Sequence, residues 1–198
     1  MPPATPLRVA ILCSSMAPYE AGMVRGVLRY GNELGTWRFL EHRAMPYCTF
    51  PELDLSAVDA VIGRIFDPAW VKPVQEAGIL AVNTSTGLED IPFPRVGTDD
   101  IAMGCLGARH LLERGYPQFG FLPYCDRWLS QRRFEGFRDV IENDAGRGCY
   151  VYHDRDREGM GIATAITQWL SEPPKPIGLM ADNDVGARLT IDCALRAG

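Results

Sequence analysis

Short apolar runs alternate with amphipathic helical patterns from one end of this 198-residue chain to the other. Each run has the length of one buried strand, and each pattern that follows repeats its apolar residues at helical spacing. Parallel strands need a crossover between them, usually a helix, so this alternation is typical of parallel sheets. The sequence therefore predicts an α/β protein, with strands at 8–13, 37–40, 57–65, 79–83, 95–98, 119–122, 149–152 and 177–181.

Capping residues indicate where the helices begin and end. The first helix is expected at 19–34, with Pro18 in its first turn and Gly35 at its C-terminal cap. A second is expected at 68–77. Asp99 or Asp100 caps a third helix, which Gly115 ends. Three more are expected: one that carries Phe134, Phe137 and Ile141, one at 162–170, and one at 185–197 with Asp184 as its cap.

These strands and helices are too many for one small sheet. We expect two doubly wound parallel-sheet lobes, an N-terminal α/β lobe at 7–98 and a C-terminal α/β lobe at 99–198. Right-handed crossovers would place helices on both faces of each sheet. The last helical pattern reaches the end of the sequence where the alternation calls for another strand, so we expect the second lobe to be incomplete.

The charge balance argues against a nucleic-acid surface on this chain. Asp and Glu outnumber Lys and Arg by 25 to 20, whereas a DNA-binding module usually shows a basic footprint. The apolar run at 9–13 is too short for a secretory signal or a membrane span. The six cysteines are scattered, without a CxxC pair or a His at ligand spacing, which favours free thiols and no metal. We expect a cytoplasmic protein without membrane contact.

Polar side chains follow almost every predicted strand, and ligands of open parallel sheets bind beyond the carboxyl ends of the strands. Asn, Asp, Arg, Ser and Thr predominate there, with the aromatic residues Tyr19, Tyr124 and Trp128 nearby. Directional donors and acceptors beside flat apolar surfaces suit a sugar better than a phosphate. The strand ends in question are 14–15, 41–43, 64, 83–85, 98–100, 124–127, 153–155 and 182–184.

Each of these residues also has an ordinary structural explanation. Asp99, Asp100 and Asp184 are typical helix N-caps. Solvated loop positions would explain Arg64 and Asn83, a solvated helix face would explain Arg132 and Arg133, and packing against apolar neighbours would explain Tyr19 and Trp128.

Enzyme motifs are incomplete in this sequence. A dinucleotide fingerprint needs three glycines. Gly159 and Gly161 match the first two, but Thr164 stands in the third position. There is no Walker loop and no G-x-S-x-G, and the histidines have no evident nucleophile partner. The segment from Asp154 begins like a calcium loop, but Ala165 stands where the bidentate Glu is needed. We therefore expect a binding protein rather than an enzyme, with no cofactor.

Four segments in order resemble the sensor domains of lac-repressor-type and periplasmic-binding-protein-like proteins. They are the first strand and helix with Gly26, residues 96–104 with 110–115 (VGTDDIAMG and HLLERG), residues 133–137 (RFEGF) and residues 181–184 (ADND). The resemblance covers the chain from Leu7 onwards and is greatest to xylose-operon regulators, in which the sensor precedes an AraC-type DNA-binding part. A strand that begins by residue 8 leaves no room for an N-terminal DNA-binding headpiece, so DNA contacts are expected only beyond Gly198.

The resemblance also implies a sugar pocket between the two lobes. Arg133 would hold ring hydroxyls with its planar fork, and Asn183 would add a donor and an acceptor. The N-terminal lobe would contribute Tyr19, Glu20, Arg64 and Asn83. The pair Asn83-Thr84 departs from the Asp-Arg pair common in these proteins, and Arg64 replaces a smaller amide, so the usual choice of hexose or ribose does not carry over.

The resulting hypothesis is the ligand-sensing domain of a sugar-responsive transcription regulator, with a pentose such as xylose as the ligand. The sugar would favour a closed form, which repositions an attached DNA-binding domain. A homodimer is expected. Two competing hypotheses stay open: a sugar-binding module without a DNA role, and a Rossmann-like enzyme, which would need a phosphate-binding loop or a paired acid and base at the strand ends.

Overall fold

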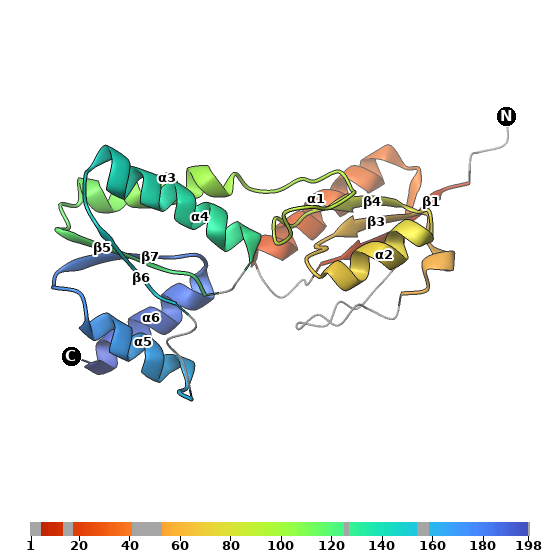
Figure 1. Ribbon diagram of the computed structural model, residues 1–198. Coiled ribbons are helices and arrows are strands. Elements are labelled where there is room, and N and C mark those ends of the chain that lie inside the picture. Colours follow the sequence, from red (N-terminus) through yellow and green to blue (C-terminus); the bar gives the residue numbers. More distant parts are fainter. Residues whose placement is uncertain (1–4, 14–17, 41–52, 125–126, 154–158, 198) are drawn as a thin grey trace. The chain divides into compact units, whose positions relative to one another are not determined.

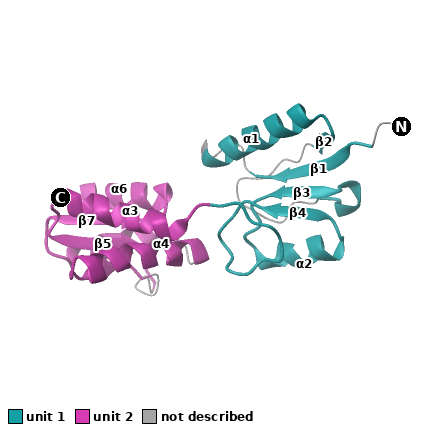
Figure 2. Ribbon diagram, turned by 90° about the horizontal axis from the view of Figure 1, so that it is seen from above, with its two compact units in different colours: residues 1–97 teal, residues 98–198 magenta. Residues whose placement is uncertain are grey.

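The computed structural model describes residues 5–13, 18–40, 53–124, 127–153 and 159–197. The chain forms two compact units, Met1–Gly97 and Thr98–Gly198, which Figure 2 shows in different colours. Each unit has its own parallel sheet and its own core, as expected for a chain in which strands and helices alternate. No helix within the described ranges is long and apolar enough to cross a membrane.

Unit 1 contains a four-stranded parallel sheet in the order β2-β1-β3-β4. Helices α1 and α2 lie on opposite sides of these strands (Figure 2). Val9, Ala10, Val61 and Val74 are fully buried. The elements are β1 (Leu7–Leu12), α1 (Pro18–Leu34), β2 (Trp37–Leu40), β3 (Ala60–Gly63), α2 (Pro68–Glu76) and β4 (Leu80–Asn83).

Unit 2 contains a three-stranded parallel sheet in the order β6-β5-β7 (Figure 1). Phe119 and Phe121 pack with Phe137 in one core cluster, whereas Leu122 packs with Tyr152 and Trp169 in another. Successive side chains of β5 thus enter different clusters, as expected for a strand covered on both faces. The elements are α3 (Asp100–Glu113), β5 (Gln118–Leu122), α4 (Trp128–Arg138), β6 (Cys149–Val151), α5 (Ile162–Ser171), β7 (Ile177–Ala181) and α6 (Asp184–Ala197).

Helices α3 and α4 touch backbone to backbone through two glycines. A Cβ atom on Gly104 of α3 would lie 2.0 Å from the carbonyl oxygen of Arg133, and one on Gly136 of α4 would lie 2.1 Å from that of Ile101. Real Cβ atoms do not approach so closely, so only glycine permits this crossing. The crossing brings the first turn of α3 beside Arg133.

Three predicted elements differ from the structure by more than one residue. Residues 95–98 do not form a strand. Arg95 makes an isolated bridge to Asn83, and because β4 ends at Asn83, the residues after Arg95 have no β4 residues beside them to pair with. The strand predicted at 57–65 is only Ala60–Gly63, because a 3-10 turn capped by Asp54 occupies Leu55–Ala57. The helix expected to carry Ile141 ends as α4 at Arg138 and continues as a π-helix, Asp139–Asp144.

Replacing Gly104 with Ala should destabilise unit 2 by about 2 kcal/mol or more, because the new methyl group would meet rigid backbone rather than a mobile side chain. Gly26→Ala is the matched control: it lies in α1 with nothing within 4 Å of its Cβ position, so it should gain up to about 1 kcal/mol of helix propensity. Urea unfolding followed by circular dichroism measures both. Equal stability of the two variants would contradict the close crossing.

Candidate functional site

Helices α3 and α6 of unit 2 are capped by side chains. The Asp99 carboxylate accepts a hydrogen bond from the backbone N–H of Ala102 at 2.9 Å, which confirms Asp99 as the cap of α3. The Asn183 side-chain oxygen accepts one from the N–H of Gly186 at 2.9 Å. Asn183 therefore caps α6, and the prediction that Asp184 does so was wrong, because Asp184 is already the first helical residue.

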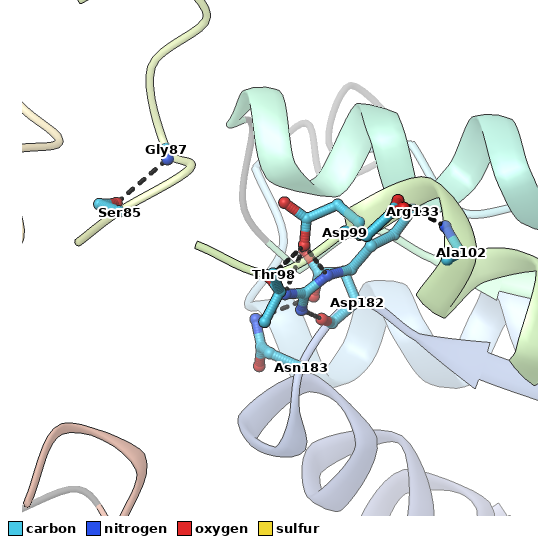
Figure 3. Close-up of polar contacts among 9 residues, drawn as sticks. Ser85, Gly87, Thr98, Asp99, Ala102, Arg133, Asp182 and Asn183 are labelled. Carbon is cyan, nitrogen blue, oxygen red and sulfur yellow. Dashed lines mark hydrogen bonds and ion pairs between the residues drawn. The ribbon is translucent and has the colours of Figure 1, made fainter. Parts of the chain in front are cut away.

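Arg133 lies at the centre of a polar network that joins α3, α4 and the end of β7 (Figure 3). Its Nε and Nη2 atoms both lie 2.8 Å from Oδ1 of Asp100. The Thr98 hydroxyl donates to the same oxygen at 3.0 Å. On the other side, Nη1 of Arg133 donates to the backbone carbonyl of Asp182, whose carboxylate accepts from the Asn183 amide at 2.8 Å.

This arrangement leaves part of the Arg133 guanidinium available. A guanidinium carries five N–H groups, and the three contacts above use the Nε–H and one N–H on each terminal nitrogen. One N–H therefore remains on each terminal nitrogen. The Arg133 side chain is 14% exposed and the Asp100 side chain 3%, so the solvated helix face considered for Arg133 does not describe it. A fixed pair of donors of this kind suits two adjacent oxygen acceptors.

Arg132, the neighbour of Arg133 in the sequence, lies in a different environment. Its Nη1 atom is 2.5 Å from Oε2 of Glu135, and its guanidinium carbon lies 5.5 Å from the ring centre of Trp128. Both members of the ion pair are about a third or more exposed. Arg132 is therefore a natural control for Arg133.

Asn83, at the end of β4 in unit 1, is fully buried and holds backbone segments together. Its side-chain oxygen accepts from the N–H groups of Ile65 at 2.9 Å and Ser85 at 3.0 Å, and its amide donates to the Ser85 carbonyl at 3.0 Å. The loops after β3 and β4 are thus joined by one amide. The solvated loop position considered for Asn83 was wrong, because its side chain carries the backbone bonds of two loops.

Glu20 and Arg64 form an ion pair in unit 1. Glu20 lies in the first turn of α1 and Arg64 directly follows β3, so the two predicted residues meet at the carboxyl end of the sheet. Both side chains are largely buried, and the Arg64 guanidinium also lies 5.6 Å from the ring centre of Phe66. Tyr19, the residue before Glu20, is exposed.

Cys13 and Thr84 lie beside this ion pair. The Cys13 sulfur is 3.9 Å from the Thr84 hydroxyl. Burial raises the pKa of the Cys13 thiol, and the negative charge of Glu20 acts in the same direction, so this cysteine is a poor nucleophile at neutral pH. Cys13, Cys105, Cys149 and Cys193 are free thiols. The described residues contain no group of three or more His, Cys, Asp or Glu placed to hold a metal.

The structure brings Asp100 and Asp182 to Arg133, although sequence reasoning did not place them among the ligand-binding residues. Both belong to predicted strand ends. Charge is the signal that marks Asp100, because a guanidinium that is mostly buried needs a carboxylate beside it. Asp182 contacts Arg133 through its backbone carbonyl, which residue type does not mark. Several further strand-end residues lie outside the described residues: 14–15, 41–43, 125–126 and 154–155.

Comparison with known proteins places this fold. The chain is 25% identical over 193 residues to the xylose operon regulatory protein of Haemophilus influenzae, a match that covers 91% of this chain and 49% of the relative. The structure of a xylose-binding transcription activator superposes with a TM-score of 0.76 at 21% identity, over 98% of this chain and 51% of that one. No family model matches the sequence.

A solute-binding protein of an ABC transporter from Burkholderia multivorans superposes with a TM-score of 0.72 at 19% identity, over 98% of this chain and 76% of that one. The chain has a periplasmic-binding-protein-like type I fold. The predicted fold class is thereby confirmed. Proteins similar in sequence and fold are regulators and solute-binding proteins, in agreement with the expectation of a binding protein rather than an enzyme. The chain spans about half the length of the xylose regulators that it matches.

Within this periplasmic-binding-protein-like fold, Asn83→Ala should destabilise unit 1 by about 2–4 kcal/mol, because it removes the partners of two buried N–H groups and one carbonyl. Asn32→Ala, an exposed change on α1, should shift stability by no more than about 0.5 kcal/mol. Urea unfolding compares the two. A loss as small as that of the control would show that the Asn83 amide does not hold the loops.

Proposed function

We propose that this chain is the ligand-sensing part of a sugar-responsive transcription regulator, with a pentose such as xylose as its ligand. The observation that carries the proposal is the state of Arg133, which is anchored on two sides and keeps one N–H on each terminal nitrogen. Two donors held a fixed distance apart match neighbouring hydroxyl oxygens of a sugar ring. The names of the xylose regulators that resemble this chain support the choice of ligand.

The remaining predicted residues fit this proposal in different ways. Asn183 uses one amide N–H on Asp182 and its oxygen on Gly186, which leaves a second amide N–H for a ligand. Glu20 and Arg64 offer an acceptor and donors at the carboxyl end of the unit 1 sheet, and the exposed ring of Tyr19 offers a flat surface. Asn83 takes a positioning role, since its amide is fully buried against Ile65 and Ser85.

DNA contact belongs, in this proposal, to a segment outside residues 1–198, of the AraC type that the resemblance implies. The net charge of −5 agrees with this division of labour, because phosphate contacts need several aligned cations. A homodimer and a cytoplasmic location remain part of the same proposal. Sugar binding would shift the protein toward the form that the ligand prefers and so change the position of the DNA-binding part.

A sugar-binding module without a DNA role is the second candidate. The likeness to a solute-binding protein, which covers 76% of that protein, favours it. Both candidates need the same ligand site, so sugar binding alone does not separate them. A pair of helix-turn-helix patterns encoded downstream of Gly198 would favour the regulator, and their absence there would favour the binding module.

A pentose should stabilise this protein against thermal unfolding. A ligand at about a hundred times its dissociation constant adds about 2.7 kcal/mol to the free energy of unfolding. Dye-monitored melting against xylose, ribose, arabinose, glucose and galactose measures the effect. We expect xylose to give the largest rise in Tm. A protein that melts at one temperature with every sugar would overturn the proposed function.

Arg133→Lys should weaken D-xylose binding about ten- to a hundredfold, because a lysine keeps the charge but loses the planar fork, and a hydrogen bond to a charged group contributes about 1.5–3 kcal/mol. Lysine also spares Asp100 the loss of its cation, which an alanine would cause. Arg132→Lys is the control and should bind almost normally, since Arg132 pairs with Glu135 instead. Calorimetric titration measures all three proteins, and equal affinities would remove Arg133 from the site.

A further inference from the structure

Two acidic residues belong to the network around Arg133. Asp100 and Asp182 are both buried, and both contact Arg133, one through its carboxylate and the other through its backbone carbonyl. The charge of Arg133 is therefore balanced by Asp100, and the Asp182 carboxylate adds a second negative charge close by. This network differs from a phosphate site, where cations exceed the carboxylates near them.

Two helix N-termini near Arg133, those of α3 and α6, already have a protein side chain bonded to a backbone N–H. A free N-terminus offers N–H groups and a partial positive charge, which is why phosphates bind there. Here the Asp99 carboxylate occupies the N-terminus of α3, and the Asn183 side-chain oxygen occupies that of α6. At each of these two N-termini, an anion would therefore compete with a side-chain oxygen of the protein.

In unit 1, the arginine among the proposed ligand residues is also matched by a carboxylate. The guanidinium of Arg64 pairs with the Glu20 carboxylate, and both side chains are largely buried. In unit 2, the neighbouring Arg132 pairs with Glu135. The arginines of the proposed ligand residues, Arg64 and Arg133, are thus each matched by a carboxylate, yet both keep hydrogen-bonding capacity.

We propose that Asp100 is a specificity-determining residue, which makes the Arg133 site accept uncharged polyhydroxyl ligands and reject phosphorylated or carboxylated ones. The inference rests on the proposed function and names the ligand class of the same site. Asp100 acts in two ways. It orients Arg133 through two contacts to one oxygen, and it cancels the charge that would otherwise attract an anion.

The test uses inorganic phosphate as the anionic probe, in calorimetric titrations against sodium chloride at matched ionic strength. Asp100→Asn keeps the size of the side chain and an oxygen for Arg133 but removes the charge. We expect this variant to bind phosphate about tenfold or more tightly than the wild-type protein, because a like charge within a few ångströms of the anion is gone. Asp182→Asn should act in the same direction.

Two controls make the outcome specific. Asp192→Asn removes an equal charge from an exposed position on α6 and should leave phosphate binding unchanged. Adding Arg133→Gln to Asp100→Asn should abolish the gain, because the released cation is then missing. A purely structural role of Asp100 would give no gain of phosphate binding. Wild-type protein that binds phosphate as tightly as Asp100→Asn would overturn the inference.

Titration with D-xylose separates this inference from the proposed function. If the wild-type protein binds neither xylose nor any other sugar, the proposed function fails, while the phosphate comparison still decides the role of Asp100. If xylose binds and Asp100→Asn gains no phosphate affinity, the ligand proposal stands and the role of Asp100 falls. We expect Asp100→Asn to change xylose affinity less than it changes phosphate affinity.

Discussion

A guanidinium can be taken out of water in a protein only when its charge and its hydrogen bonds are met by other groups. For Arg133, Asp100 meets the charge, and Asp100 and the carbonyl of Asp182 together meet three of the five N–H groups. The first turn of α3 supplies the carboxylate, α4 supplies the cation, and the end of β7 supplies the carbonyl. One side chain thus connects three elements that are distant in sequence.

Unit 1 solves a similar problem with a neutral group. The amide of Asn83 holds the backbone after β3 and β4 by three hydrogen bonds and carries no charge into the interior. An amide costs less to bury than an ion does, and it needs no counter-charge. One ion pair of that unit, Glu20 with Arg64, lies at the carboxyl end of the sheet. A fully buried amide thus joins the loops of unit 1, whereas a mostly buried ion pair joins α3 to α4 in unit 2.

The fold was predictable because the alternation of apolar runs and helical patterns is long and regular. Strands at 37–40 and 177–181 were predicted to the residue, since each is a short apolar or aromatic run that follows clear turn residues. The ends that failed depend on longer-range effects. A strand at 95–98 would need β4 to continue past Asn83. Instead β4 ends there, and the side chain of Asn83 bonds to the backbone of an adjoining loop.

The site was predictable only in part. The resemblance to known sensor domains pointed to Glu20, Arg64 and Arg133, and the structure shows a buried or partly buried ion pair at each arginine. The partner of Arg133 was harder to foresee, because Asp99 and Asp100 are identical neighbours with different tasks. Asp99 faces the N–H groups of its own helix, and Asp100 faces α4. Consecutive residues of a helix point in different directions, and the sequence pattern alone does not show which of the two aspartates points toward α4.

The glycine crossing of α3 and α4 separates the scaffold from the recognition chemistry. Because Gly104 and Gly136 set the two backbones against each other, the distance between the start of α3 and Arg133 does not depend on which side chains lie there. Polar side chains near Arg133 such as Thr98 can therefore be varied on a constant frame, provided that position 100 keeps an oxygen acceptor for the mostly buried guanidinium. Changing the ligand preference of the proposed site becomes a problem of exchanging a few polar groups, with the helix positions given in advance.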